Sequence, residues 1–151
     1  GKTSKRVSGM NKNFFLNFSD VEDYSVVCIY FGDSVGLIEG SWSTMSNGQI
    51  PTGPIVYGTE GVIVADRYDK EIKVYKELKP YVTSPGPDEV HLAEDTGDAL
   101  AMNIWNFLHD GKPLHQMITA EFNMKIMAAF DAGRRSCESG VTEYTYEPFQ
   151  P

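Results

Sequence analysis

The chain has 151 residues, enough for one domain that buries about 70% of the surface of its unfolded chain. Its composition, 41% hydrophobic and 23% charged, is ordinary for a globular protein and excludes wholesale disorder. The formal charge of −8 excludes a nucleic-acid backbone as the main partner, because such binding requires clustered Lys and Arg.

No apolar run in these residues approaches the roughly 20 residues of a membrane span, and we expect no signal peptide. We therefore expect neither a membrane nor a nucleic acid as partner. The one basic cluster lies close to the start of the chain and is typical of a solvated chain end. Its members are Lys2, Lys5, Arg6 and Lys12.

Cys28 and Cys137 have no disulfide-framework or metal-ligand spacing. We expect both to be reduced thiols that pack against apolar neighbours, as in a cytoplasmic protein. The chain begins at Gly1 and its first methionine is Met10, so we expect a piece of a longer protein.

The first two-thirds of the chain carries strand patterns. Residues 7–10 and 14–18 predict an extended opening segment. The next segment, 24–31 (YSVVCIYF), is almost wholly β-branched or aromatic, which predicts a strand with apolar partners on both faces. Because a Gly-Asp-Ser turn links it to residues 35–43, the two segments predict a hairpin.

A loop at 45–54 precedes a second predicted hairpin at 55–64, IVYGTEGVIV. Its Gly-x-x-Gly pair has the form of a phosphate loop, but such a loop needs a helix behind it, and here a strand follows. Glu60 would also repel an anion. We therefore predict a tight turn in which Gly58 and Gly61 supply positive φ. Residues 71–77 then alternate as a strand, and 79–97, with three prolines, predict a long loop.

The last third predicts two helices and a final strand at 141–146. The first helix covers 98–108, and the second has Thr119 as its N-cap, Glu121 in its first turn and Gly140 at its end. Each helix carries an apolar stripe that predicts burial. The stripes are Leu100, Ile104, Phe107 and Leu108 beside Ala101 and Trp105, and then Phe122, Ile126, Ala129 and Phe130. The order of elements predicts an α+β fold with a largely antiparallel sheet.

No complete catalytic or metal-binding constellation is present. His91 lies near Glu94 and Asp95, which permits a self-contained hydrolase as a third hypothesis, although a solvated acidic run explains these residues more simply. His109 and His115 lack the spacing of metal ligands, and no serine sits in a Gly-x-Ser-x-Gly elbow. We assign no catalytic, cofactor-binding or metal-binding residue.

Trp42 is the one candidate for substrate contact. Flanked by Ser41 and Ser43, it could offer an aromatic surface to a sugar-like molecule. The alternative is a residue that packs on a sheet face or in an interface.

Read together, several segments resemble one family. Residues 23–27 (DYSVV) followed by 40–43 (GSWS) resemble a first hairpin, and 57–63 (YGTEGVI) is similar to a second. Residues 107–113, 119–121 and 132–140 (AGRRSCESG) resemble two final helices. The family is the glucose-fructose oxidoreductase, inositol dehydrogenase and rhizopine-catabolism (Gfo/Idh/MocA) dehydrogenases, and the resemblance runs over almost the whole chain.

The resemblance implies that residues 1–151 form the single C-terminal substrate and dimerisation domain of a two-domain NAD(P)-dependent oxidoreductase. It implies an open-faced antiparallel sheet with helices on one face, a homodimer formed through the other face, and a sugar, cyclitol or related polyol as the small-molecule substrate. NAD or NADP would bind to an N-terminal Rossmann domain outside this chain. We therefore expect the chain alone to hold no cofactor and to be inactive.

The catalytic motifs of the family are absent from this sequence. It contains no Gly-x-Gly-x-x-Gly, and Glu77-Leu78-Lys79-Pro80 has one residue more than the family's Glu-Lys-Pro and lies far downstream of it. We do not assign the catalytic lysine to Lys79. The family's Asp-x-x-x-His helix would end just before a segment that resembles residues 1–7. The alternative hypothesis is a stand-alone, non-catalytic binding or assembly module with this fold.

Overall fold

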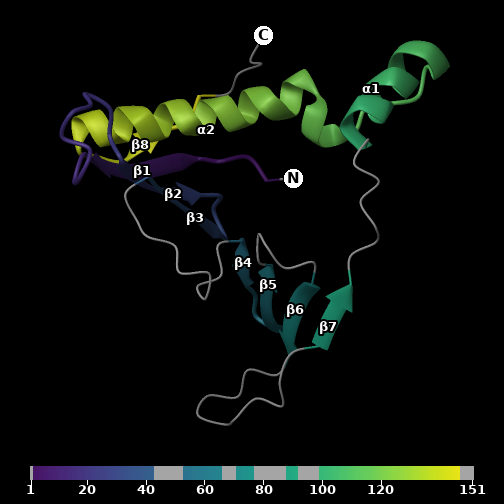
Figure 1. Ribbon diagram of the computed structural model, residues 1–151, viewed down its shortest axis with the longest axis horizontal. Coiled ribbons are helices and arrows are strands. Elements are labelled where there is room, and N and C mark those ends of the chain that lie inside the picture. Colours follow the sequence, from purple (N-terminus) through teal and green to yellow (C-terminus); the bar gives the residue numbers. More distant parts are fainter. Residues whose placement is uncertain (1, 43–52, 66–70, 77–87, 92–98, 147–151) are drawn as a thin grey trace. The chain divides into compact units, whose positions relative to one another are not determined.

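A computed structural model describes residues 2–42, 53–65, 71–76, 88–91 and 99–146. The chain divides into two compact units, residues 1–44 with 103–151, and residues 45–102. Figure 1 shows the strands and helices of the chain. They are β1 (Arg6–Lys12), β2 (Tyr24–Tyr30), β3 (Val35–Ser41), β4 (Ile55–Tyr57), β5 (Gly61–Ala65), β6 (Glu71–Lys76), β7 (Asp88–His91), α1 (Ala99–Asp110), the 3₁₀ turn η1 (Gln116–Ile118), α2 (Ala120–Ser139) and β8 (Glu143–Tyr144).

The first unit contains a four-stranded antiparallel sheet in the order β3-β2-β1-β8. The hairpin of β2 and β3 is confirmed, with Tyr30 opposite Val35 and the turn between them. Gly32 in that turn has φ 102°, a conformation that only glycine adopts readily, and this explains the residue type. β8 adds the C-terminal segment to the sheet beside the N-terminal strand.

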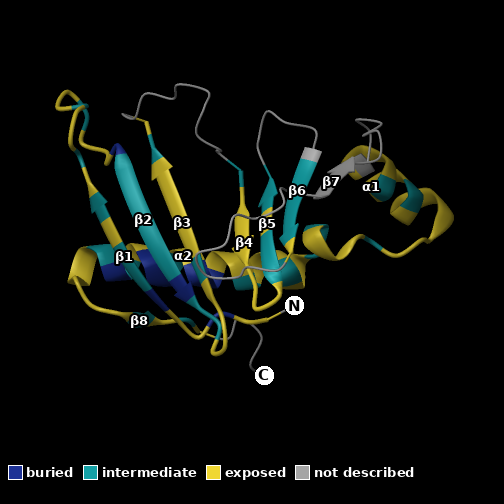
Figure 2. Ribbon diagram, turned by 90° about the horizontal axis from the view of Figure 1, so that it is seen from below, coloured by how far each residue is buried: buried dark blue, intermediate teal, exposed yellow. Residues whose placement is uncertain are grey.

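The core of this unit lies between the sheet and α2. Val7 and Ile29 from the strands meet Ala129 and Ala132 from the helix. Partly buried Val27 and Phe31 pack against them. In Figure 2 the buried residues concentrate where α2 crosses β1 and β2.

Two glycines let α2 approach β1 closely. A Cβ at Gly9 would lie 2.8 Å from Cys137 Sγ and 3.0 Å from the carbonyl oxygen of Gly133. A Cβ at Gly133 would lie 3.3 Å from Val27 Cγ1. This contact gives a physical reason for the small residues on the buried side of α2, Ala132, Gly133 and Ser136, because a larger side chain at these positions would separate the helix from the sheet.

Both predicted ends of α2 are confirmed. The hydroxyl of Thr119 accepts the backbone N–H of Phe122 at 3.3 Å, and Gly140 ends the helix with φ 73°. Glu121 lies in the first turn, where its negative charge interacts favourably with the positive end of the helix dipole.

The second unit contains an antiparallel sheet in the order β4-β5-β6-β7. The hairpin around Gly58 and Gly61 is confirmed, with Gly58 N–H donating to Gly61 C=O at 2.8 Å. The predicted role of the glycines is wrong, since neither is among the positive-φ glycines of the described residues. Gly61 is instead needed because a Cβ there would collide with the carbonyl oxygen of Tyr75 on β6.

Three local predictions are wrong. Residues 14–18 form a bent loop and no strand, because the carboxylate of Asp23 takes up their N–H groups. Residues 88–91 form β7 inside the segment predicted as loop. Much of both helical stripes is exposed, for example Leu108 on α1 and Phe130 on α2.

The predicted class is confirmed: the chain is α+β with antiparallel sheets, and α2 covers one face of the first sheet. The rest of the loop predicted over 79–97, residues 79–87 and 92–97, lies outside the described residues.

Candidate functional site

Trp42 directly follows β3, and 88% of its surface is exposed. Its backbone N–H donates to the carbonyl oxygen of Asp23 at 2.8 Å, so the main chain is fixed while the indole projects into solvent. The residue therefore contributes an accessible aromatic face and no packing in the core.

Asp23 organises the neighbouring loop between β1 and β2. Its side chain is 1% exposed and accepts the N–H groups of Phe14, Phe15 and Leu16 at 2.9, 2.7 and 2.8 Å. These bonds lower the pKa of the carboxyl below its ordinary value, and the bond from Phe14 contributes most. They stabilise the charged carboxylate by more than burial destabilises it. Asp23 thus ties the loop to the end of the sheet.

Asn13 completes the same loop from the other side. Its amide nitrogen lies within hydrogen-bonding distance of three backbone carbonyls, those of Leu16, Ser19 and Val21, at 2.8 to 3.1 Å. The loop is therefore shaped by internal hydrogen bonds. Its polar anchors point inward and leave the apolar side chains outside.

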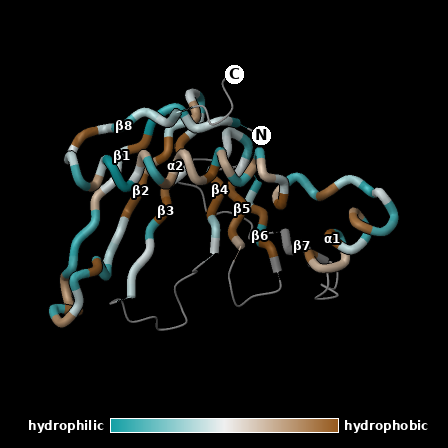
Figure 3. The backbone as a smooth tube through the Cα atoms, turned by 90° about the horizontal axis from the view of Figure 1, so that it is seen from above, coloured by the Kyte–Doolittle hydropathy of each residue, from teal (hydrophilic) through white to brown (hydrophobic). Residues whose placement is uncertain are grey.

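We call the exposed apolar residues at this end of the sheet the aromatic tip. Phe15 and Phe18 are 73% and 85% exposed, and the ring of Phe14 meets Tyr24 edge-on with 5.7 Å between centroids. Figure 2 shows the loop as largely exposed, and Figure 3 shows that part of it is hydrophobic. The members of the tip are Phe14, Phe15, Phe18, Val21 and Trp42. Such a surface can stack on or pack against a partner, but it supplies no acid or base.

The face of the first sheet opposite α2 is called the open face here. Side chains alternate between faces along a strand, and directly paired residues share a face. Because Val7 and Ile29 point to α2, the pairs Met10–Val26 and Cys28–Leu37 point to the open face. Leu37 is 64% exposed. The prediction that β2 has apolar partners on both faces is confirmed for the face that meets α2. For the open face it stays a prediction.

The helix side of the same unit holds a cavity of about 650 Å³. This volume is within the range of roughly 300–1,000 Å³ seen for ligand sites. Its lining is Lys2, Ser4, Ile29, Phe31, Ser34, Ile38, Gln116, Phe122, Lys125, Ile126, Ala129 and Phe130.

The ionic groups around the cavity are already paired. Lys2 Nζ lies 2.7 Å from Asp33 Oδ1, and Lys125 Nζ lies 2.7 Å from Glu121 Oε1. Each lysine lowers the pKa of its carboxyl partner, mainly through the hydrogen bond. The cavity can therefore hold an apolar group. No carboxylate lines it, and the two carboxylates that pair with its lysines, Asp33 and Glu121, are stabilised in the charged form, which is unsuited to general acid catalysis at neutral pH. Sequence reasoning missed this cavity, because its walls come from residues up to about 130 positions apart.

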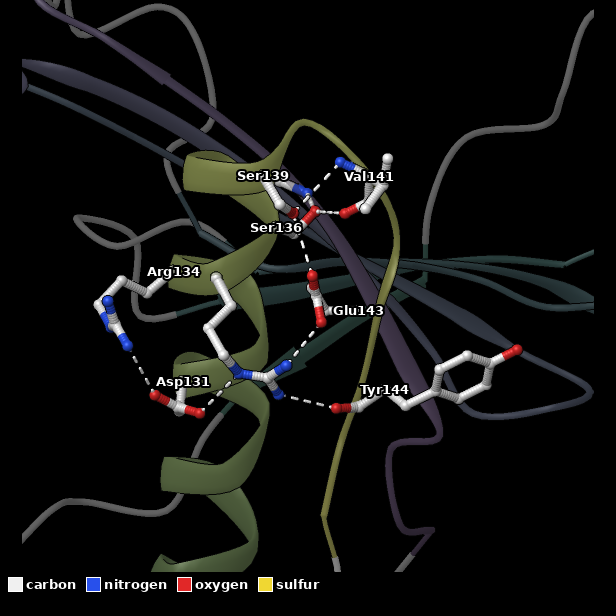
Figure 4. A network of polar contacts seen from close by, with 9 residues as sticks. Asp131, Arg134, Ser136, Ser139, Val141, Glu143 and Tyr144 are labelled. Carbon is white, nitrogen blue, oxygen red and sulfur yellow. Dashed lines mark hydrogen bonds and ion pairs between the residues drawn. The ribbon is translucent and has the colours of Figure 1, made fainter.

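A polar network joins α2 to the C-terminal segment (Figure 4). The guanidinium of Arg135 reaches Asp131 at 3.0 Å, Glu143 at 2.6 Å and the carbonyl oxygen of Tyr144 at 2.8 Å. Hydrogen bonds from Arg135 and, to a smaller extent, from Arg134 lower the pKa of Asp131. Arg135 therefore fixes β8 to the helix and is committed to this structural contact.

The histidines form no joint site in the described part of the chain. The Nδ1 atom of His109 lies 3.0 Å from the carbonyl oxygen of Trp105, and its ring stacks on the Trp105 ring with 4.4 Å between centroids. His115 caps η1. No group of three or more His, Cys, Asp or Glu that could hold a metal occurs among the described residues. Glu94 and Asp95, the proposed partners of His91, lie outside them.

The two cysteines are free thiols. Burial raises the pKa of Cys137, with smaller contributions from Glu22 and Glu138, so this thiol stays protonated at neutral pH. Among the helices of the described residues, none is long and apolar enough to cross a bilayer.

No known protein-family profile and no curated protein sequence matches the chain. Solved structures do match its fold. The chain aligns over 99% of its length with a putative oxidoreductase from Klebsiella pneumoniae, at 14% identity and a TM-score of 0.74. It aligns over 95% with an NAD-binding oxidoreductase from Klebsiella pneumoniae, at 15% identity and a TM-score of 0.68.

A third neighbour is the WlbA dehydrogenase from Bordetella pertussis, solved with NADH and UDP-GlcNAcA, at 17% identity and a TM-score of 0.56. The alignment covers 98% of this chain. The chain spans 45%, 46% and 40% of these three structures, less than half of each. The comparison therefore confirms, for the fold, the resemblance found in the sequence: this chain has the fold of one part of these oxidoreductases.

Proposed function

We propose that this chain is the C-terminal, substrate-pocket and dimerisation part of a two-domain NAD(P)-dependent oxidoreductase that acts on a sugar, cyclitol or related polyol. The observation that carries the proposal is the alignment of almost the whole chain with less than half of each matched oxidoreductase. The substrate class is supported by the sequence resemblance and by the nucleotide sugar bound to one neighbour.

The dinucleotide would bind outside this chain. The sequence of this chain has no Gly-x-Gly-x-x-Gly, the loop that lets a backbone approach a pyrophosphate at a helix N-terminus. The described residues also offer no acid–base pair at a common site. The chain would therefore supply a wall of the pocket and the subunit contact, while hydride transfer depends on the rest of the protein.

Dimerisation would use the open face. Met10, Val35 and Leu37 on this face are exposed, and a sheet with one uncovered apolar face gains stability when a second copy covers it. The two free thiols support a cytoplasmic location, where thiols stay reduced.

Trp42 is the residue of this chain that we propose to contact substrate. Its exposed indole offers the aromatic face on which a sugar ring can stack, and its backbone is held by Asp23.

The enzymatic proposal is tested by incubating the longer polypeptide that contains this chain with NAD⁺ or NADP⁺ and a panel of polyols and nucleotide sugars. Formation of the reduced dinucleotide with at least one member is expected. Failure of every substrate, together with no dinucleotide binding, would favour the stand-alone module.

A further inference from the structure

The cavity beside α2 exists because the helix leaves one strand of the first sheet uncovered. Among the described residues, the backbone of α2 comes close to β1, β2 and β8 but not to β3. Ile38 on β3 faces the helix side, because its ladder partner is Val27, and Val27 lies against Gly133 of α2. Ile38 lines the cavity and is exposed. A strip of apolar surface therefore stays open to solvent next to the helix.

The cavity continues the hydrophobic core outward. Ile29 and Ala129 belong both to the buried core and to the lining. On α2 the lining continues with Phe122, Ile126 and Phe130, which follow one another along one stripe of the helix. Ile126 and Phe130 are exposed, and a ligand that covered them would remove apolar surface from water. The interior of the cavity therefore selects an apolar group.

The charged residues in the lining are both lysines, Lys2 from the first sheet unit's N-terminal segment and Lys125 from α2. Their ionic partners, Asp33 and Glu121, are not in the lining. Both ion pairs are exposed and so contribute little to stability. An ammonium group has several N–H donors, so each lysine can bind the anionic group of a ligand while it keeps its carboxylate partner. The rim of the cavity therefore offers positive charge to whatever lies inside.

A third cation lies close to the same rim. Lys5 Nζ would be 3.6 Å from a Cβ at Gly32, in the turn between Phe31 and Ser34, which both line the cavity. Lys5 makes no ion pair among the described residues. Three lysines thus stand against two carboxylates here, in a chain whose formal charge is −8. This local excess of positive charge is opposite in sign to the chain as a whole and favours an anion.

We propose that this cavity binds an amphipathic anion. Its apolar chain or ring system lies over Ile29 and Ala129, and its carboxylate, sulfate or phosphate group is held by Lys2 and Lys125. The site is separate from the proposed substrate contact, because Trp42 is not in the lining. The inference therefore stands independently of the assignment as an oxidoreductase.

Other classes of ligand fit this cavity less well. A nucleotide or a free sugar needs several polar partners, and the uncharged polar residues of the described lining are Ser4, Ser34 and Gln116. A cationic amphiphile would be repelled by the lysines, and a neutral hydrocarbon would make no use of them. A molecule with an apolar body and one anionic end matches both the interior and the rim.

The test is isothermal titration calorimetry of the full polypeptide that contains this chain with dodecanoate, which has one apolar chain and one carboxylate. We expect saturable binding at concentrations too low for micelles to form. Dodecyltrimethylammonium has the same chain and the opposite charge, and it should bind at least about tenfold more weakly. Circular dichroism checks that each variant is folded.

Two matched variants on α2 test the position of the ligand. Ile126→Asp places a carboxylate in the lining and should raise the Kd for dodecanoate at least about tenfold. Met127→Asp is the control, because it makes the same change at the next position, which is exposed and outside the lining, and the Kd should be unchanged. If Ile126→Asp does not fold, the lysine variants on the rim still decide the question.

The anionic group is tested separately. Lys2→Gln with Lys125→Gln should raise the Kd for dodecanoate about tenfold and leave the Kd for dodecanol, the neutral analogue, unchanged. Lys112→Gln is the control, because Lys112 pairs with Asp110 and does not line the cavity.

Three results would overturn the inference. No binding of dodecanoate would show that the cavity is closed or filled in the full polypeptide. Equal effects of Ile126→Asp and Met127→Asp on the Kd would place the ligand elsewhere. Equal binding of dodecanoate and dodecyltrimethylammonium would show that the lysines do not recognise the ligand.

Discussion

The carboxylate of Asp23 accepts the backbone N–H of Phe15 at 2.7 Å, and the carbonyl oxygen of the same Asp23 accepts the N–H of Trp42 at 2.8 Å. One buried residue thus positions the two segments that carry the exposed rings of the aromatic tip. The polar bonds are inside the loop, and most of the rings are outside it.

We predict that Asp23→Asn lowers the melting temperature more than Asp20→Asn, the exposed control. The amide keeps the size of the carboxylate, but it removes the charge and turns an NH₂ group toward N–H donors. Thermal denaturation followed by circular dichroism measures the difference. Equal melting temperatures would show that the three backbone bonds do not hold the loop.

Acid should destabilise the protein through the same group. The folded pKa of Asp23 is lowered by its backbone donors, and that of Asp131 by Arg135 and Arg134. The stabilisation from a lowered pKa is fully present above the unfolded value of about 3.8 and is lost as the pH falls through the lower folded value. We expect the free energy of unfolding to fall below about pH 4, and to fall less steeply in Asp23→Asn. Urea titrations at pH 7, 4 and 3 would test this, and parallel pH profiles would contradict it.

Ser136→Ala should destabilise the first unit. The buried hydroxyl accepts the N–H of Gly9 at 2.9 Å and donates to the carbonyl oxygen of Val141 at 2.6 Å. Its removal leaves two backbone groups without partners, at a cost of about 1–3 kcal/mol for each buried unsatisfied group. Ser139→Ala on the same helix is the control: its hydroxyl bonds to Glu143 and to the N–H of Val141 are exposed, so water can replace them and the cost should be smaller. Chemical denaturation that found equal costs would refute this role of Ser136.

Gly9→Ala should lower the free energy of unfolding by about 1–3 kcal/mol, as expected for overpacking. The new methyl group would contact both Cys137 Sγ and the carbonyl oxygen of Gly133. Combining it with Cys137→Ala removes the first obstacle but not the second. The double variant should therefore recover only part of the additional loss, and full recovery would show that the Gly133 backbone is not in the way.

Trp42→Ala should raise the KM of the parent enzyme for its sugar-like substrate by about tenfold, with a smaller effect on kcat, since a stacking platform binds the ground state as well as the transition state. Trp105→Ala is the control, because this indole stacks on His109 of its own helix. Steady-state kinetics with an unchanged KM in Trp42→Ala would remove Trp42 from the substrate site.

The sequence predicted the elements that depend on local chemistry. The caps Thr119 and Gly140 and the turn at Gly32 follow from single residues with strong conformational preferences, and the hairpin around Glu60 follows from the two apolar runs that flank it. The α+β class followed from the order of these elements.

What the sequence did not predict depends on contacts between distant residues. The aromatic residues at 14–18 have the composition of a strand, but Asp23 captures their backbone donors and bends the chain. The sequence predicts Gly61 to be needed for the turn. In the structure a side chain at Gly61 is excluded because it would collide with the backbone of Tyr75 on the neighbouring strand. The exposure of Trp42 and the cavity beside α2 likewise arise from tertiary packing, which the hydrophobic periodicity of the sequence does not predict.

We propose that this chain is one part of an NAD(P)-dependent oxidoreductase whose dinucleotide binds in the rest of the protein. Fluorescence titration with NADH and NADPH, on the parent polypeptide and on residues 1–151, tests it most directly. We expect micromolar binding of one dinucleotide by the parent and none by residues 1–151. Equal binding by both would place the cofactor in this chain, and no binding by the parent would contradict the assignment as an oxidoreductase.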